Sequence, residues 1–395
     1  CVSGAGALNI DYKNRTVEVD GVVLKEGDFI SLNGTTGEIY NGQVETKAAE
    51  LSGDFAELMA LCEKYTKLVV RTNADTPHDA QVARDFGAVG IGLCRTEHMF
   101  FEAEKIVAMR EMILSQDAEG RKVALAKLLP YQKADFYGIF KAMDGCPVNV
   151  RLLDPPLHEF VPHDLKGQEE MAKAMGVTVE YIQQRVDSLC EANPMLGHRG
   201  CRLGNTYPEI TEMQTRAILG ACIQLKKEGH DPHPEIMVPL TGILYEFEAQ
   251  EKVIRETAAA LFAEEGESVE FKVGTMIEIP RAALTANRIA SRAEYFSFGT
   301  NDLTQMTFGY SRDDIASFLP VYLEKKILKV DPFQVLDQNG VGQLVEMAVE
   351  KGRSVRPELK CGICGEHGGE PSSVKFCHKV GLNYVSCSPF RVPIA

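Results

Sequence analysis

Two arginines and a glutamate stand directly after short apolar runs of the sequence. Arg95 follows G-I-G-L-C, Arg151 follows V-N-V, and Glu278 follows G-T-M-I. Arginine supplies a planar fork that pairs bidentately with phosphate or carboxylate, so the two arginines suit a small dianionic ligand. The alternative is that each arginine forms a salt bridge with Glu97 or Asp154 at the rim of the fold.

A second carboxylate follows a later apolar run. Asp302 ends the motif F-G-T-N-D, and with Glu278 it gives the hard oxygen ligands that Mg²⁺ takes from proteins, one or two at a time. The turn Gly299-Thr300-Asn301 also offers backbone N–H groups to an anion. The alternative assigns Asp302 to a helix cap and Glu278 to a buried ion pair.

The motif C-G-I-C-G-E-H-G-G contains two cysteines, Cys361 and Cys364. Such a pair occurs in zinc sites and in redox motifs, but no second closely spaced ligand pair accompanies it, although His367 is near. The glycines around Cys364 predict a thin, accessible loop, which favours a reactive thiol there. An inert buried cysteine is the other interpretation.

The segment N-P-M-L-G-H-R-G carries Arg199 between two apolar runs, from where it could close over an anion. A plain surface loop is the alternative. Several other histidines show no ligand-like spacing, and we interpret them as structural or solvated: His78, His158, His163, His230, His233 and His378.

Eight short apolar runs, rich in β-branched residues, alternate with longer helical segments. We place them at residues 68–71, 88–94, 147–153, 235–240, 272–279, 295–298, 359–364 and 382–387. This pattern is typical of parallel strands with crossover helices, and eight strands close a (β/α)₈ barrel of the TIM type. We therefore predict the α/β class, with the side chains above meeting at the carboxyl ends of the strands.

Two connections, from the second run to the third and from the third to the fourth, are too long for one helix each. We expect inserted helices at residues 131–140, after a break at Pro130, and at residues 168–192.

The first part of the chain has a different pattern. Residues 16–23 and 29–40 largely alternate apolar and polar side chains around Asp-Gly and Asn-Gly turn signals, which predicts a small β-rich fragment. A helical pattern begins at Thr46. We therefore divide the chain into a β-rich part (1–45), a linker helix (46–66) and the barrel (67–395).

Composition narrows the class of protein. The formal net charge of -14 argues against a nucleic-acid partner, and no apolar run approaches membrane-spanning length. Eleven cysteines, an odd number, favour reduced thiols in a cytosol-like compartment over a disulfide framework. The chain begins at Cys1 without a leader pattern, so we expect a piece of a longer polypeptide without a signal peptide.

Four motifs together resemble the pyruvate, phosphate dikinase family of phosphoenolpyruvate (PEP)-utilising enzymes. They are G-I-G-L-C-R-T-E-H-M-F-F, N-P-M-L-G-H-R-G, F-S-F-G-T-N-D-L-T-Q-M and C-G-I-C-G-E-H-G-G, and the resemblance extends over essentially the whole chain.

The resemblance implies roles for the candidate residues. It assigns substrate binding to Arg95, Arg151, Glu278, Gly299, Thr300, Asn301, Asp302 and Arg199. It makes Glu278 and Asp302 the Mg²⁺ ligands and Cys364 the proton-transferring thiol, with PEP and pyruvate as substrates.

The same resemblance implies a place in a larger enzyme. The β-rich part would be the end of a swivelling phosphohistidine domain, preceded by an ATP-grasp domain, in a cytoplasmic phosphotransferase that forms a homodimer through the barrel. The family's phosphohistidine motif, T-S-H-A, is absent from this sequence. We therefore expect this chain to be unable to run the full cycle from ATP, pyruvate and phosphate to AMP, PEP and diphosphate.

Three other functions remain open at this point. PEP synthase and enzyme I of the sugar phosphotransferase system share the barrel, although the motifs G-I-C-G-E-H-G-G and R-T-E-H-M-F-F fit the dikinase better. A non-catalytic PEP-binding module is the third, and a complete Glu, Asp and Cys set argues against it.

Overall fold

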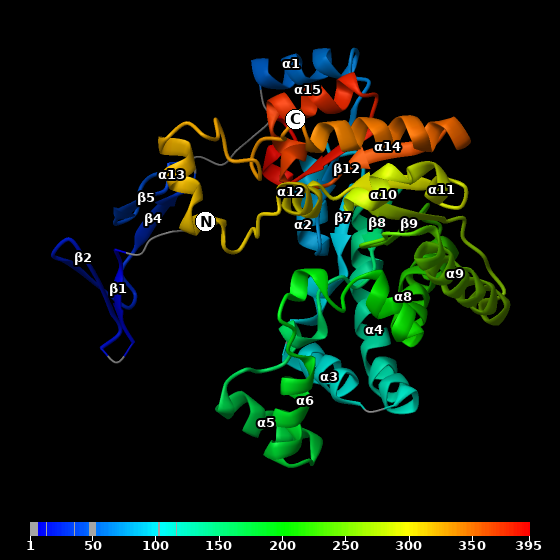
Figure 1. Cartoon of the computed structure of the whole chain (residues 1–395), viewed down its shortest axis with the longest axis horizontal. Coiled ribbons are helices and arrows are strands. Elements are labelled where there is room, and N and C mark those ends of the chain that lie inside the picture. The colour runs from blue at the N-terminus through cyan, green and yellow to red at the C-terminus, as the bar shows by residue number, and fades with distance from the viewer. Residues whose placement is uncertain (1–6, 13, 35, 47–52, 102, 116) are drawn as a thin grey trace. The chain divides into compact units, whose positions relative to one another are not determined.

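The computed structural model describes residues 7–12, 14–34, 36–46, 53–101, 103–115 and 117–395. The chain divides into two compact units, Cys1–Ala60 and Leu61–Ala395 (Figure 1). Each unit has its own strands. Among the described residues, no helix is long and apolar enough to cross a membrane.

The first unit contains short antiparallel strands, as its alternating pattern predicts. β1 (Asn9–Asp11), β2 (Thr16–Val19) and β3 (Val22–Lys25) form one sheet, and β4 (Ile30–Asn33) pairs with β5 (Glu38–Asn41). Asp20 and Gly21 have φ angles of 48° and 79°, the left-handed pair that a tight hairpin between β2 and β3 requires. Helix α1 (Asp54–Glu63) crosses the division between the units, and residues 47–52 of the predicted linker helix lie outside the described residues.

The second unit is a closed barrel of eight parallel strands, which confirms the predicted fold. All eight apolar runs become strands: β6 (Val69–Asn73), β7 (Ile91–Arg95), β8 (Pro147–Arg151), β9 (His233–Val238), β10 (Lys272–Ile277), β11 (Tyr295–Phe298), β12 (Lys360–Ile363) and β13 (Tyr384–Cys387). The strands follow one another around the barrel in sequence order, and β13 closes on β6.

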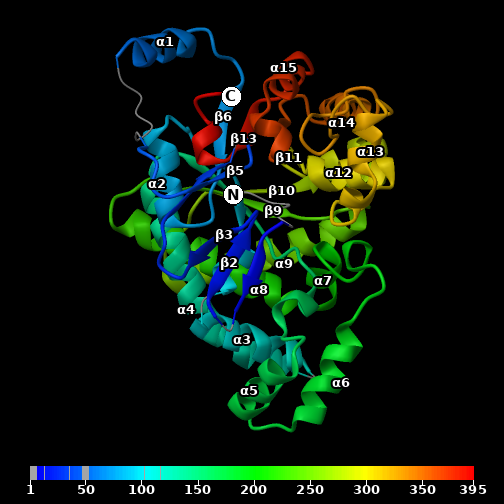
Figure 2. The same cartoon turned by 90° about the vertical axis from the view of Figure 1, so that its left-hand side faces the viewer.

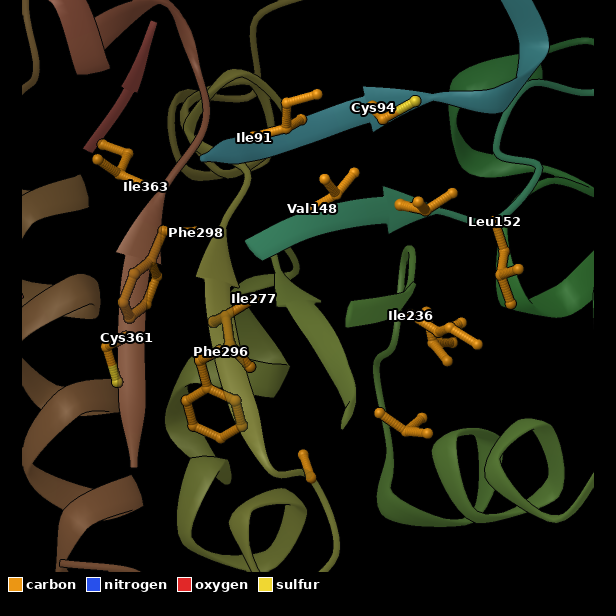
Figure 3. Packing of buried hydrophobic residues seen from close by; sticks show 14 of the residues in the cluster. Ile91, Cys94, Val148, Leu152, Ile236, Ile277, Phe296, Phe298, Cys361 and Ile363 are labelled. Atoms are coloured by element: carbon orange, nitrogen blue, oxygen red, sulfur yellow. The ribbon is translucent and has the colours of Figure 1, made fainter. Parts of the chain in front are cut away.

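Helices separate the strands. They are α2 (Pro77–Asp85), α3 (Ala103–Leu114), α4 (Ala118–Ala142), α5 (Leu165–Met175), α6 (Val179–Leu189), α7 (Cys201–Thr206), α8 (Pro208–Lys227), α9 (Leu244–Glu265), α10 (Pro280–Leu284), α11 (Ala286–Ala290), α12 (Thr300–Phe308), α13 (Leu319–Glu324), α14 (Val341–Val355) and α15 (Pro371–Lys379). Most of them lie against the outside of the barrel, whereas α5 and α6 project away from it at the bottom of Figures 1 and 2. The main core lies between strands and helices, and Figure 3 shows part of it, including Phe296, Phe298 and Cys361.

The structure corrects the two predicted inserted helices. Helix α4 does not break at Pro130 but runs through it, because Leu125, Leu128 and Phe136 on both sides of the proline are buried against α3 and α8. That packing outweighs the cost of about 3 kcal/mol that an internal proline carries. The helix predicted over residues 168–192 is two helices, α5 and α6, because Gly176 (φ 67°) ends the first.

Alternation along the strands gives the barrel a polar inner layer near its amino end, which we call the amino-end cluster. Glu235 accepts from Arg71 Nη1 at 2.8 Å through one oxygen and from Lys360 Nζ through the other. Beside them, Tyr295 donates to the side-chain oxygen of Asn149 at 2.9 Å. Each of these side chains enters from a strand and is enclosed by the barrel wall.

Candidate functional site

A cavity of about 320 Å³ opens at the carboxyl ends of the strands. It is lined by seven of the nine residues that the sequence singled out: Arg95, Arg151, Glu278, Gly299, Asn301, Asp302 and Cys364. The other two, Thr300 and Arg199, lie behind this lining and contact it, as described below. The strand-end rule therefore brings residues from five different strands to one place.

Arg151 is held by two carboxylates at the floor of the cavity. Its guanidinium pairs with Glu97 through Nη2 and with Asp154 Oδ2 through Nη1 at 3.0 Å. Both acids are buried, so the salt bridges that sequence reasoning placed at the rim lie inside the site instead. A ligand anion that meets Arg151 would find the side chain already oriented.

Arg199 comes from the loop before α7 and reaches the same network. Its Nη2 lies 2.6 Å from Asp154 Oδ2, and its Nη1 lies 3.3 Å from Asp302 Oδ1. The side chain is only 4% exposed, so the interpretation as a plain surface loop is wrong for Arg199 itself. Burial acts against the Asp154 carboxylate, but Arg151 and Arg199 outweigh it and lower its pKa.

Arg95 makes fewer close ion pairs than Arg151 or Arg199. Its guanidinium is 28% exposed and lies 3.8 Å from Asp75, whose carboxylate instead accepts the backbone N–H of Arg95 at 2.6 Å. The other Asp75 oxygen lies 2.8 Å from His98 Nδ1. The hydrogen bond to Asp75 thus fixes the backbone of Arg95. The guanidinium of Arg95 remains available to the cavity that it lines.

Glu278 is fully buried with one oxygen satisfied and the other free. The backbone N–H of Leu240 donates to Oε1 at 2.6 Å, whereas Oε2 has no hydrogen-bond partner. Leu240 holds the left-handed conformation (φ 60°) that bulky residues rarely adopt, and this aims its N–H at the carboxylate. Burial, followed by the charges of Asp302 and Asp154, raises the pKa of Glu278 well above its usual value.

These carboxylates fit a divalent cation. Burial also raises the pKa of Asp302, so two acids at this end of the cavity resist ionisation unless a cation joins them. The free Oε2 of Glu278 lies close to Gly299, where an added Cβ would meet it at 2.4 Å. Among the described residues, no three His, Cys, Asp or Glu side chains form a metal site, so any cation here needs ligand or water oxygens as well, as Mg²⁺ does.

The turn after β11 is fixed from behind by a buried histidine. His367 accepts from the Thr300 hydroxyl at Nδ1 (2.8 Å), because its Nε2 must donate to the Pro332 carbonyl (2.9 Å). A Cβ on Gly365 would meet the Thr300 hydroxyl at 2.1 Å, so glycine is required for this approach. The Asn301 side-chain oxygen is buried without a partner. Both ring nitrogens of His367 are therefore used in hydrogen bonds that hold this turn, and burial lowers the pKa of His367.

Cys364 lies at the end of β12 with its thiol inside the barrel. Its backbone is held by the N–H donation to Phe298 O (3.2 Å) and by Asn73, whose amide donates to the Cys364 carbonyl (3.2 Å). Burial raises the pKa of the thiol to about 11, and the thiol lies 3.7 Å from the Phe298 carbonyl oxygen, to which it donates. At neutral pH the group is a protonated acid, suited to giving a proton to a carbon next to it.

The zinc and redox interpretations of the cysteine pair do not fit the structure. Cys361 belongs to the outer core between strand and helices, while Cys364 belongs to a separate cluster inside the barrel. Strand alternation therefore points the two thiols to opposite faces. The ten cysteines that the structure describes are all free thiols.

Sequence reasoning missed several residues of the site. Glu97 and Asp154 entered it only as alternative salt-bridge partners, and Asp75, Glu159 and Arg312 not at all, although the last two line the cavity. Glu97 and Asp154 lie just beyond strand ends, so the rule that found Arg95 and Arg151 would also have found them.

The chain matches the family model for the PEP-binding domain of PEP-utilising enzymes over residues 49–395. Curated relatives with similar sequences are pyruvate, phosphate dikinases. Those of Clostridium symbiosum and Giardia intestinalis are 59% and 57% identical to this chain, and the chloroplastic enzyme of Mesembryanthemum crystallinum is 57% identical. Each match covers 100% of this chain but 45%, 45% and 42% of the relative, respectively. The chain thus spans less than half the length of the relatives it matches.

Proposed function

Because the chain belongs to the PEP-utilising enzyme family, we propose that it carries the phosphoenolpyruvate/pyruvate half-reaction of a pyruvate, phosphate dikinase. One observation supports this most directly: the two arginines, two carboxylates and thiol that the sequence singled out at strand ends, Arg95, Arg151, Glu278, Asp302 and Cys364, line a single cavity at the mouth of the barrel. The three relatives named above are dikinases, which favours this function over PEP synthase, enzyme I or a non-catalytic module.

The proposed reaction has two events. The bond between phosphorus and the enol oxygen of PEP breaks, the phosphoryl group passes to a histidine nitrogen outside this chain, and the electron pair stays on the oxygen as an enolate. Cys364 then gives its proton to the methylene carbon to form pyruvate, and the resulting thiolate regains a proton from solvent. In the opposite direction the thiolate removes the proton from the methyl group.

The site residues take separate roles in this scheme. Arg95 and Arg151 bind the anionic oxygens of the substrate, and the Asn301 side chain, through its amide N–H groups, and the Gly299 turn contact it from the β11 side. Arg199 adds a third positive charge through Asp154. Glu278 and Asp302 are the residues that would hold Mg²⁺. Bound Mg²⁺ supplies positive charge that stabilises the enolate oxygen.

We also propose how the chain fits into the longer enzyme. Residues 1–45 are the end of a swivelling phosphohistidine domain, residues 46–66 a linker that contains helix α1, and residues 67–395 the PEP/pyruvate-binding barrel. The rest of the phosphohistidine domain and the ATP-grasp domain would lie outside this sequence, and the barrel would form a homodimer in the cytoplasm. Without T-S-H-A the chain should bind PEP but make no ATP from AMP, diphosphate and PEP; sustained ATP synthesis by this chain would contradict the proposal.

Calorimetry with oxalate, an analogue of the pyruvate enolate, tests the metal ligands. Glu278→Ala and Asp302→Ala should each weaken Mg²⁺-dependent oxalate binding strongly while the chain stays folded, because each removes one of two protein ligands. Asp187→Ala, which changes an exposed acid on α6, is the matched control. Unchanged oxalate affinity with an unchanged Mg²⁺ requirement would exclude the mutated residue from the metal site.

A further inference from the structure

One wall of the cavity is apolar. Five buried side chains form a cluster on the inner face of the barrel, separate from the outer core: Leu93, Met237, Met276, Tyr295 and Cys364. Leu93, Met276 and Cys364 also line the cavity, whereas Met237 and Tyr295 do not. The Cys364 thiol therefore lines the cavity beside two apolar side chains, Leu93 and Met276, which we call the apolar wall.

Apart from Met195, the rest of the lining is polar or charged. Apart from the apolar wall and Cys364, its side chains are those of Arg95, Arg151, Glu159, Glu278, Asn301, Asp302, Gln305, Arg312, Asp313 and Met195. Met195 belongs to the loop that carries Arg199, and it is not part of the inner cluster. A small ligand with two charged ends and one carbon group thus has a single apolar surface beside the proton donor for that carbon group.

The apolar wall has little room to move. Met276 is 3% exposed and Leu93 is 2% exposed. A Cβ added to Gly299 would meet the terminal methyl of Met276 at 2.7 Å, so that methyl lies directly beneath the turn after β11. Glu278 follows Met276 by two residues on the same face of the strand, and Arg95 follows Leu93 in the same way. Close-packed side chains between fixed groups adapt poorly to a larger ligand.

We propose that Leu93 and Met276 limit the length of the carbon chain that the site accepts, admitting the methyl or methylene group of pyruvate and PEP and excluding an ethyl group. This inference rests on the proposed function, because it takes Cys364 as the acid that faces this carbon. One extra methylene group in a fitted apolar pocket changes the specificity by roughly 10–200-fold. The excluded class is 2-oxo acids with a longer chain, with 2-oxobutyrate as the smallest example.

The test compares exchange of the C3 hydrogens of pyruvate and of 2-oxobutyrate in deuterated water with Mg²⁺, followed by NMR. The parent chain should favour pyruvate by about tenfold or more. Leu93→Ala and Met276→Ala should each reduce this preference by about tenfold, because each opens the wall toward the cavity. Met237→Ala is the matched control, since it empties space in the same cluster without lining the cavity, and it should keep the preference of the parent.

Oxalate, which carries no carbon chain, reports in parallel whether each variant keeps an intact site. If both wall variants bind oxalate like the parent and still prefer pyruvate as strongly, the proposal is overturned. If only one of the two variants binds oxalate, its preference between pyruvate and 2-oxobutyrate alone decides whether the proposal stands. A parent chain that does not exchange pyruvate would overturn the proton-transfer step of the proposed function instead. The wall is then tested by the affinities of pyruvate and 2-oxobutyrate in competition with oxalate, with the same expected shift.

Discussion

The two ends of the barrel interior both contain buried charged residues, but they differ in how completely the polar atoms of these residues are hydrogen-bonded. At the amino end, both oxygens of Glu235 accept from Arg71 and Lys360, and Tyr295 donates to the side-chain oxygen of Asn149. At the mouth, Arg151 and Arg199 are also paired with buried acids, but several buried oxygens have no partner: Glu97 Oε2, Asp154 Oδ1, Glu278 Oε2 and Asn301 Oδ1.

This difference distinguishes polar residues that stabilise the barrel from polar residues that bind ligands. In the amino-end cluster only the Arg71 Nε lacks a partner, so the charges there largely complete one another. A buried oxygen without a partner costs about 1–3 kcal/mol, and the mouth carries several. We infer that the mouth keeps these oxygens for ligands, whereas the amino-end cluster only holds strands together.

We expect the largest effect from a substitution that removes the proposed proton donor at the mouth and leaves the amino-end cluster unchanged. Cys364→Ala should slow exchange of the pyruvate methyl hydrogens by roughly 10²–10⁴-fold, the loss typical of removing a positioned acid. Mg²⁺-dependent oxalate binding should persist, because the thiol holds neither anion nor metal. Cys361→Ala, on the outer face of the same strand, serves as the control and should exchange at nearly the parental rate.

Exchange by Cys364→Ala at the parental rate would remove the thiol as the proton carrier. His367 would not replace it, because both of its ring nitrogens are engaged by Thr300 and Pro332. A bound water would then be the remaining candidate.

The next effect concerns stability at the amino end. Glu235→Ala leaves the buried Arg71 and the partly buried Lys360 without their shared carboxylate, which should cost about 3–5 kcal/mol in the free energy of urea unfolding. Glu278→Ala should cost much less, since it removes a carboxylate whose second oxygen is already unpartnered. Equal losses for the two variants would contradict the distinction between the two ends.

The third prediction sharpens the comparison among the arginines of the mouth. Arg95→Lys and Arg151→Lys should each weaken PEP binding, since a hydrogen bond to a charged group contributes about 1.5–3 kcal/mol and lysine lacks the fork. Only Arg151→Lys should also lower the unfolding free energy, because only Arg151 is held by two buried acids. Arg216→Lys on the surface of α8 is the control for binding. PEP binding as tight as in the parent would show that charge alone suffices.

The smallest effect is a pH dependence. Burial works against the Glu235 carboxylate, but Arg71 and Lys360 outweigh it and lower its pKa below the usual value of 4.5. Its stabilising contribution is therefore complete above pH 4.5 and is lost as the pH falls through the folded-state pKa. The stability gap between the parent and Glu235→Gln should therefore shrink as the pH falls below 4.5. A constant gap between pH 7 and pH 3 would contradict this assignment.

Local patterns in the sequence determined the barrel and most of the mouth. Eight apolar runs predicted eight strands, because β-branched residues between turn signals favour buried parallel strands. Arg95, Arg151, Glu278 and Cys364 could be placed together because the carboxyl ends of all strands in such a barrel meet at one face. The odd spacing of Cys361 and Cys364 along one strand also accounts for their position on opposite faces.

Only the tertiary structure decided which charges pair and where helices continue. Arg199 contacts Asp302 from 103 residues away, and Arg71 contacts Glu235 across 164 residues, separations at which no sequence period relates two side chains. The helix through Pro130 persists because α3 and α8 bury both of its halves, a gain that local propensity does not contain. Periodicity reports which face a residue takes, whereas pairing and packing depend on neighbours that the closed barrel brings together.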